Sequence, residues 1–465
     1  MRGFLASSIG VATAAALALP LALTTPAQAE TAPVTPAGST QSLPLVPLGP
    51  SADRTPGVPG MSASPRLPET QGLAAREVRT FSLVGVVWDD ASTELVGHVQ
   101  VRTRSKLTAA WSDWQDLETH NSEHAADPDA AERVSGRVRG ATAPLWVGES
   151  DGVEVRVQAE PSARAATRAP GRLPTGMRIE LVDPGEEQPV AVLDGKNGTP
   201  VDDDTGEAVA GPPGMSLETA EASAANLPHA QLGAAEISAL NKADSTADAV
   251  FASDGALTAA ARPYIGPRPR IVTRKGWGAD ESLREKGFVY TKTVKAAFVH
   301  HSASGNNYTC KQAPALLRSL YRYHVVSSGW RDLGYNFAVD KCGTVYEGRA
   351  GGVGKAVLGA HTMGFNSDSM GIAVLGSYSS TAPPKAAVDA VARLTAWKLG
   401  LFGANPRAKT TLKSAGGNLY AKGRNVRLNV ISGHRDGFAT ECPGRHLYGK
   451  LPSARTSSAK LQGRP

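Results

Sequence analysis

Apolar and polar residues alternate with a period of two in several short runs of the C-terminal half of the chain. Such alternation is typical of strands with one buried face, and nearly continuous apolar runs are typical of strands buried on both faces. The runs are 294–301, 335–340, 344–348, 370–376 and 426–432. The segment DKCG between the second and third runs predicts a hairpin turn.

Apolar residues spaced three or four apart lie between these runs and predict two helices, 314–327 and 384–401. The first helix places Leu316, Leu320 and His324 on one face, where we expect His324 to be buried and structural. Strands that alternate with helices indicate an α/β fold. We therefore expect a mixed central sheet flanked by helices.

A second set of period-two runs lies in residues 76–183. The alternating positions are Phe81, Leu83 and Val87, then Val99 and Val101, then Val153, Val155 and Val157, then Met177, Ile179 and Leu181. Glycine, proline and aspartate residues separate these runs. The pattern predicts a small β-rich, sandwich-like domain ahead of the α/β domain.

Some polar and aromatic residues of this β-rich domain have alternative interpretations. Trp111 and Trp114 could stack on sugar rings, but packing in the core is the favoured interpretation. His98, His120 and His124 have no close metal-ligand spacing, so we interpret them as solvated or hydrogen-bonded side chains.

Composition divides the rest of the chain. Two stretches are rich in Pro, Ser, Thr, Ala, Gly or Asp and nearly free of aromatic residues, so they cannot bury enough apolar surface to offset chain entropy. The predicted divisions are a signal peptide (1–29), a linker (30–75), the β-rich domain (76–183), a disordered linker (184–261), the α/β domain (262–456) and a tail (457–465).

The first 29 residues have the features of an export signal. Arg2 precedes a short apolar run, and Ala27-Gln28-Ala29 is the small-x-small pattern that signal peptidase cuts. No later segment has the roughly 18 to 20 continuous apolar residues that a membrane span needs. We expect a secreted monomer, extracellular or associated with a cell wall.

Charge is unevenly distributed. The whole chain carries a formal net charge of +6, but residues from Arg262 onward contain 31 Lys and Arg against 10 Asp and Glu, a net of +21. A positive field of this size concentrates polyanions near the surface. Outside a cell we expect anionic wall polymers or lipid headgroups as partners, and no nucleic acid; a solvated basic surface without a partner is the alternative interpretation.

The three cysteines restrict the chemistry further. An exported chain with three cysteines can close one disulfide and leaves one thiol over. Cys310 and Cys342 lie in loop-like surroundings that suit a bridge, which leaves Cys442. A free thiol with His434 eight residues before it on a loop favours a metal, and zinc suits mixed imidazole and thiolate ligands.

Polar side chains also gather at the ends of the predicted strands. His300 and His301 end one buried strand, His434 follows another, and Tyr335 begins a third. In an extended segment, residues two apart share a side. Thr440 is therefore expected to point where Cys442 points.

Five motifs in this order resemble the peptidoglycan recognition protein domain, which is related to zinc N-acetylmuramoyl-L-alanine amidases and bacteriophage amidase-lysozymes. They are IVTRKGWGA, FVHHSAS, GWRDLGYNFAVDKCGTVYEGR, GAHTMGFNSDSMGIAVLGSY and GHRDGFATECPG. The resemblance covers about residues 262 to 456. It implies the family's α/β fold, a Zn²⁺ cofactor and peptidoglycan as partner.

The resemblance also implies roles for individual residues. The family's zinc ligands correspond to His300, His434 and Cys442, and its catalytic tyrosine corresponds to Tyr335. The phage enzymes have lysine at the oxyanion-contacting position, whereas this chain has Thr440, as many recognition-protein amidases do.

Four further residues are candidates for substrate binding. His361 and Asn366 resemble groove residues, Arg349 follows the hairpin and could line the groove, and His301 could hydrogen-bond to a ligand or to substrate. No carboxylate in the motifs is an obvious general base. Glu347 is the nearest candidate by sequence, with a hairpin surface position as the alternative.

Three functions are compatible with the sequence. The favoured one is a secreted zinc amidase that hydrolyses the amide between N-acetylmuramic acid and L-Ala, in which three protein ligands leave one zinc position for water. The second is a binding module, because family members that lack the cysteine ligand bind peptidoglycan without cutting it. The third is an adaptor in which Cys442 pairs with Cys310 or Cys342 and no metal binds.

Overall fold

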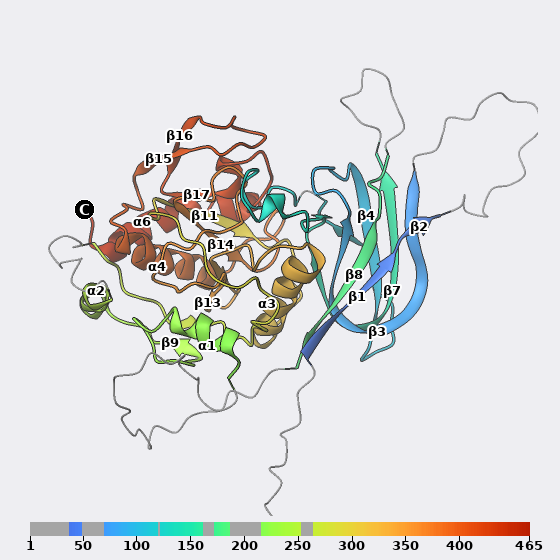
Figure 1. The fold of residues 1–465 in the computed structure, drawn as a ribbon, viewed down its shortest axis with the longest axis horizontal. Helices are drawn as coiled ribbons and strands as arrows, with labels where there is room; N and C mark the ends of the chain where they lie inside the picture. Colours follow the sequence, from blue (N-terminus) through green and yellow to red (C-terminus); the bar gives the residue numbers. More distant parts are fainter. Residues whose placement is uncertain (1–36, 49–68, 120, 161–171, 187–214, 253–263) are drawn as a thin grey trace, which may run out of the picture. The chain divides into compact units, whose positions relative to one another are not determined.

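A computed structural model describes residues 37–48, 69–119, 121–160, 172–186, 215–252 and 264–465. Its elements belong to a β-rich region and to an α/β region that follows it in the chain (Figure 1). The signal peptide, most of the first predicted linker and residues 187–214 and 253–261 of the second lie outside the described residues. Residues 36–465 form one compact unit.

The β-rich region is an antiparallel sheet of eight strands. They are β1 (Ala37–Pro44), β2 (Val46–Pro47), β3 (Thr70–Trp88), β4 (Gly97–Ser105), β5 (Gln115–Leu117), β6 (Gly140–Ala141), β7 (Leu145–Ala159) and β8 (Arg178–Gly185). The strand order is β1-β8-β3-β7-β4-β5, and β2 and β6 also pair with β3. Alternate residues such as Phe81, Val99 and Val155 meet in one core cluster, as their period predicts.

Secondary structure differs from the composition-based expectation in two places. β1, β2 and the start of β3 lie within residues 30–75, and two helices lie within residues 184–261. β1 pairs along its length with β8, so its backbone groups are satisfied by a sheet that the rest of the chain builds. Composition therefore underestimates the order of a segment that adds an edge strand.

The connection between β5 and β6 becomes important for the site. It contains one short turn of 3₁₀ helix, η1 (Arg133–Ser135). We call its residues 121–139 the cap segment. The C-terminal end of the cap segment leads directly into β6, and its N-terminal end follows β5 by three residues in the chain.

The α/β region contains a mixed sheet of seven strands in the order β17-β11-β14-β12-β13-β10-β9. Their bounds are β9 (Glu236–Ile237), β10 (Ile271–Val272), β11 (Ala296–His301), β12 (Phe337–Val339), β13 (Val345–Glu347), β14 (Ser369–Val374) and β17 (Ile431–Gly433). β11 lies between β14 and β17 and is parallel to both. The expected mixed sheet is confirmed.

Helices and short turns cover this sheet (Figure 1). They are α1 (Leu217–Ala224), α2 (Lys242–Phe251), η2 (Cys310–Gln312), α3 (Ala313–Arg322), η3 (Tyr323–Ser327), α4 (Lys385–Leu401), η4 (His434–Asp436), α5 (Arg445–Tyr448) and α6 (Leu451–Gln462). The predicted helix 314–327 is an α-helix that ends in a π-helical turn. The predicted strand 426–432 is two strands, because β16 (Asn425–Asn429) pairs with β15 (Lys409–Lys413) while β17 joins the main sheet.

Cys310 and Cys342 form a disulfide with their Cα atoms 6.2 Å apart, and Cys442 is free and buried. The predicted pairing is confirmed, and the adaptor hypothesis with a Cys442 disulfide is wrong. Within the described part of the chain, no helix has the length and apolar character that crossing a membrane requires.

Candidate metal centre

The topology of the sheet brings two predicted ligands to one edge. His300 lies near the end of β11, and His434 directly follows β17, the parallel neighbour of β11. The carboxyl ends of adjacent parallel strands meet at the same edge, so these imidazoles converge. The loop after His434 folds back, because the Arg435 amide donates to the Cys442 carbonyl at 3.0 Å.

A glycine fixes the end of this loop. Gly444 has φ +82°, and a Cβ atom there would lie 2.4 Å from the Tyr378 carbonyl carbon. Only glycine fits this position. The Cys-Pro-Gly sequence thus holds Cys442 against the sheet edge.

Four side chains form a compact cluster at this edge: His124, His300, His434 and Cys442, with one ligand atom from each lying within 4.8 Å of the others. His124 Nε2 lies 3.2 Å from His434 Nδ1 and 3.4 Å from Cys442 Sγ. Cys442 Sγ lies 3.8 Å from His300 Nδ1. The three residues that the resemblance implies as ligands therefore lie together, joined by His124 from the cap segment.

The donor set fits zinc. Zn–N distances of ~2.0 Å and Zn–S distances of ~2.3 Å in a tetrahedron place ligand atoms about 3.3 to 3.6 Å apart, close to the separations observed here. Mixed imidazole and thiolate donors are the set that zinc prefers. Within the described residues, His434 Nε2 and His124 Nδ1 are also buried without a hydrogen-bond partner.

Burial controls the protonation of the cluster. It lowers the pKa of His124, His300 and His434 well below the usual histidine value, and the neighbouring imidazoles lower it further. Burial raises the pKa of the Cys442 thiol well above its usual value. The imidazoles are therefore neutral and able to bind a metal, and metal binding would release the thiol proton.

His124 was not predicted as a ligand. It lies 310 residues from His434 in the chain, so no spacing rule connects the two. The signal available in the sequence was the composition around it, because residues 121–132 contain four acidic residues and no Lys or Arg. Such a stretch complements a domain with a net charge of +21.

His301 and His361 lie on opposite sides of His300. The Nδ1 atom of His301 accepts from the Tyr378 amide at 3.3 Å, and its Nε2 lies 3.7 Å from Glu118 Oε2. His361 is fully buried behind His300, with the ring centroids 5.4 Å apart. It contacts Thr362, whose hydroxyl lies 3.4 Å from His300 Nε2. His361 therefore packs against a cluster residue, and its predicted contact with substrate stays a prediction.

Tyr335 and Thr440, the predicted catalytic residues, both lie beside the cluster. The ring of Tyr335 is 5.4 Å from that of His300, and burial raises the pKa of its phenol, which stays protonated. The Thr440 hydroxyl donates to Glu123 Oε1 at 2.8 Å and accepts from the Cys442 amide at 3.1 Å. The expectation that Thr440 points where Cys442 points stays a prediction, because this contact is to the backbone of Cys442.

Arg349 and Asn366 both contact the cap segment. Arg349 forms a two-pronged ion pair with Glu132, with both N–O distances at 2.9 Å. The Asn366 side chain donates to Asp127 at 2.8 Å and to the Ala125 carbonyl at 2.9 Å.

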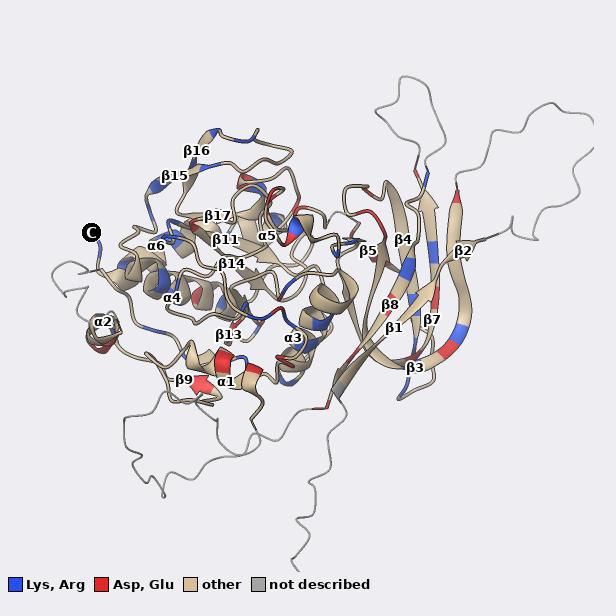
Figure 2. Cartoon of the chain, viewed as in Figure 1, with Lys and Arg blue, Asp and Glu red and all other residues tan. Residues whose placement is uncertain are grey.

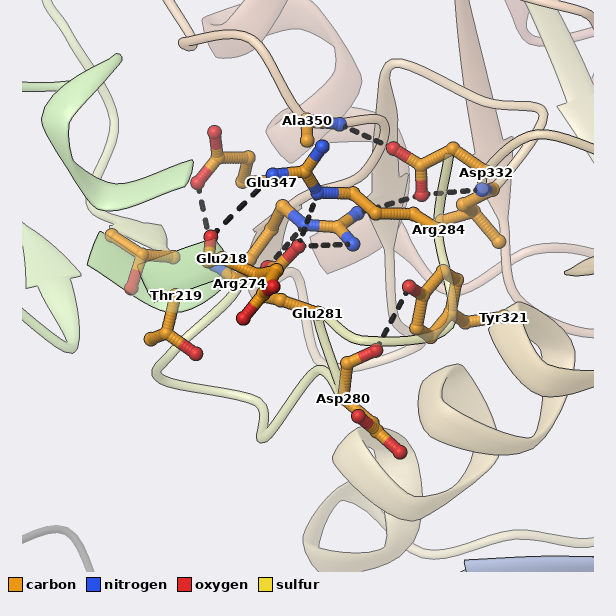
Figure 3. A network of polar contacts seen from close by, with 12 residues as sticks. Glu218, Thr219, Arg274, Asp280, Glu281, Arg284, Tyr321, Asp332, Glu347 and Ala350 are labelled. Atoms are coloured by element: carbon orange, nitrogen blue, oxygen red, sulfur yellow. Dashed lines mark hydrogen bonds and ion pairs between the residues drawn. The ribbon is translucent and has the colours of Figure 1, made fainter. Parts of the chain in front are cut away.

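Two other candidates lie outside the cluster. The Glu347 carboxylate accepts from the Asn226 amide and the Arg274 backbone, and burial raises its pKa to about 7 (Figure 3). It is a buried structural group rather than a hairpin surface residue. His324 is buried, accepts from the Gly334 amide and stacks near Trp330, which agrees with its predicted structural role.

Trp111 and Trp114 of the β-rich region lie under arginine side chains rather than in a core cluster. Trp111 is 38% exposed, and the Arg102 guanidinium lies over both Trp111 and Trp114. Arg156 lies over Trp114 as well. Arginine side chains on adjacent strands cover these rings, so the interpretation as core residues is wrong for Trp111.

Two family profiles match the chain. Residues 290–445 match the family described as N-acetylmuramoyl-L-alanine amidase. Residues 26–174 match the one described as Rv3811 N-terminal galactose-binding domain-like.

Individual proteins resemble the α/β region. Peptidoglycan-recognition protein SC2 of Drosophila simulans is 31% identical over 183 residues, which cover 39% of this chain and 84% of that protein. The N-acetylmuramoyl-L-alanine amidase of Homo sapiens is 31% identical over 207 residues, 42% of this chain and 30% of the human protein. A solved structure of peptidoglycan recognition protein-LE in complex with tracheal cytotoxin, a monomeric diaminopimelic acid-type peptidoglycan, is 26% identical, covers 39% of this chain and 92% of that chain, and has a TM-score of 0.32.

Proposed function

The chain belongs to the peptidoglycan-recognition protein and N-acetylmuramoyl-L-alanine amidase family, and on this basis we propose that it is a secreted, zinc-dependent amidase. Its substrate is peptidoglycan, and it hydrolyses the amide between N-acetylmuramic acid and L-Ala. The observation that carries the proposal is the cluster of His300, His434 and Cys442 ligand atoms at one sheet edge. The resemblance implies that family members without this cysteine bind peptidoglycan and do not cut it.

Zinc held by these three residues would polarise the scissile carbonyl and activate water. Tyr335 and Thr440 supply hydrogen bonds from the protein. The Tyr335 phenol keeps its proton because it is buried, so it can donate to a developing oxyanion. The Thr440 hydroxyl is held in place by the Cys442 amide and can donate in the same direction once Glu123 no longer accepts from it.

The basic surface supports an anionic wall polymer as partner. Lys and Arg residues occur on β15, β16, α3, α4 and α6 (Figure 2). Residues 262–465 carry a net charge of +21, which attracts anionic wall polymers and the carboxylates of stem peptides.

Product analysis of the full chain on purified peptidoglycan tests the proposal. An amidase frees L-Ala amino termini without creating new reducing sugar ends. Cys442→Ala is expected to remove both this release and the bound zinc, whereas His98→Ala, at an exposed histidine paired with Glu160, is expected to change neither. Release of L-Ala termini by zinc-free Cys442→Ala protein would contradict the zinc mechanism.

One observation favours the alternative of a non-catalytic recognition module. His124 gives the cluster four protein donors, and a site closed by four protein ligands is typical of structural zinc. Such a protein would bind insoluble peptidoglycan and release no L-Ala termini under any condition. The same product analysis therefore distinguishes the two functions.

A further inference from the structure

The metal centre is covered by a segment of the N-terminal region. We propose that the cap segment holds the centre in a latent state, with His124 as a fourth, exchangeable protein ligand that water replaces when the cap segment moves away. This inference rests on the proposed amidase function. It assigns a regulatory role to the β-rich region, which is fused to the amidase fold.

The first argument is coordination. A hydrolytic zinc site keeps one position open for water, whereas four protein ligands close it. His124 Nε2 lies within 3.4 Å of both His434 Nδ1 and Cys442 Sγ, so it takes the fourth corner of the donor set. The covered site cannot hold the water that hydrolysis needs.

The second argument is access. His300, His434 and Cys442 have no exposed surface, and His124 itself is buried. A cross-linked wall polymer cannot reach atoms that solvent does not reach. Hydrolysis therefore requires that some segment move, and the cap segment is the one that covers the cluster through His124.

The third argument is that carboxylates of the cap segment bind the side chains that are predicted to act in catalysis or to bind substrate. Glu123 accepts from the Thr440 hydroxyl, and its carbonyl accepts from the Met363 amide at 3.0 Å. Asp127 accepts from Asn366, and Glu132 pairs with Arg349. Three residues predicted to bind substrate or act in catalysis are thus occupied by carboxylates of the cap segment.

The fourth argument is that the contact is suited to opening. Polar and charged contacts hold the cap segment in place. The residues near His124 and Glu132 in the chain include Ala125, Ala126, Ala130 and Ala131, whose side chains have little apolar area. Val134, a larger apolar side chain of the segment, is 67% exposed instead of docked. A pocket of about 150 Å³ lies between residues 126–132 and the α/β region. An anionic wall polymer would compete for the same cationic and amide groups.

Metal spectroscopy on the full chain tests the ligand assignment independently of activity. The protein is loaded with Co²⁺ in place of zinc, and its visible absorption is recorded while azide is added. Wild-type protein is expected to show a four-coordinate spectrum that azide leaves unchanged. His124→Ala is expected to open one position to water, so its spectrum differs and shifts with azide, while His98→Ala behaves as wild type.

Activity on peptidoglycan tests the latency. His124→Ala is expected to release L-Ala termini at least about ten times faster than wild type. The reason is that a larger fraction of its molecules has a metal position open to water. Glu132→Gln keeps all four cluster residues but weakens the pairing with Arg349, and is expected to give a smaller increase. This second variant keeps the test decisive if His124→Ala folds poorly.

Each outcome has a separate meaning. An azide-insensitive His124→Ala spectrum equal to that of wild type would overturn the ligand assignment. Loss of activity in both variants would overturn latency and indicate that the cap segment contributes to catalysis. An altered, azide-sensitive His124→Ala spectrum with no L-Ala release from any protein would support the fourth ligand and overturn the proposed amidase function instead.

Discussion

The ionic network around Arg274 and the metal cluster are both buried, but they differ in how their polar groups are compensated. Arg274 is buried between Glu281 and Asp332, and its guanidinium also donates to the Gly348 carbonyl (Figure 3). Burial alone would lower the pKa of Arg274, but Asp332 and Glu281 raise it well above its usual value. Every charge in this network has an opposite charge beside it.

The metal cluster has no such compensation. Its neutral imidazoles and a protonated thiol face one another with no opposite charge between them. Buried polar groups are normally hydrogen-bonded, so an exception requires an explanation. A cation between His124 Nε2, His434 Nδ1 and Cys442 Sγ explains why these donors are buried together, whereas the Arg274 network is complete without one.

Removing one ligand should have the largest effect. His434→Ala leaves too few donors for tight zinc binding, and we expect amidase activity to fall by more than about 100-fold, since even partners of ligands typically contribute 10- to 100-fold. Zinc content measured after dialysis should fall in parallel. A His434→Ala protein that retains stoichiometric zinc would show that the cluster is not the metal site.

Replacing Arg274, the centre of the ionic network, should lower the free energy of unfolding without removing the metal. Arg274→Met leaves Asp332 buried without its cation and leaves Glu281 with Arg284 alone, and breaking a buried ion pair typically costs about 3 to 5 kcal/mol in the free energy of unfolding. Urea unfolding measures the change, and zinc per folded molecule should stay constant. A variant that lost zinc while remaining folded would show that the two clusters depend on each other.

A matched change at the surface sharpens this result. Arg270 pairs with Glu236, and both side chains are largely exposed. Arg270→Met should therefore change the free energy of unfolding by only about 0 to 1 kcal/mol in the same urea experiment. A large effect there would mean that Arg274→Met reports loss of general charge rather than loss of a buried partner.

The smallest effect is expected at Lys398, a buried lysine whose hydrogen bonds go to backbone carbonyls. Its ammonium donates to two backbone carbonyls, and burial lowers its pKa to about 7, while Glu347 opposes the shift. Because unfolded lysine titrates near 10.4, unfolding takes up a proton between those values, so this group adds stability as pH rises from about 7 to 10. That contribution is lost as pH falls through 7.

Thermal unfolding at several pH values measures this effect. The midpoint of wild type relative to Lys398→Met should increase between pH 6.5 and 9.5. Lys385→Met removes a lysine that is 87% exposed and should show no such trend. Parallel curves for all three proteins would mean that Lys398 stays charged in the folded protein.

Much of the α/β region follows from local sequence. Period-two runs correctly placed β11 and β14, and the strand ends correctly brought His300 and His434 to one edge. The split of 426–432 into β16 and β17 was not predictable, because pairing with different partners leaves the alternation unchanged. The disulfide followed from cysteine count and loop context.

The contacts that distant segments make with the site could not be predicted from the sequence. Arg349, Asn366 and Thr440 were identified as site residues, but their partners in the cap segment lie more than 200 residues away. Local patterns carry no information on which loop will lie over a finished domain. The acidic stretch around His124 indicated a basic partner without indicating where on it the histidine would lie.

The attachment of the β5–β6 connection at both ends has a further consequence. A propeptide that is cut away cannot return, but a loop whose two ends are fixed in one sheet remains at a high effective concentration near the surface it leaves. Restraint of this kind is reversible. A molecule that leaves its wall substrate would return to the inactive state unaided, which confines hydrolysis to the time spent on the polymer.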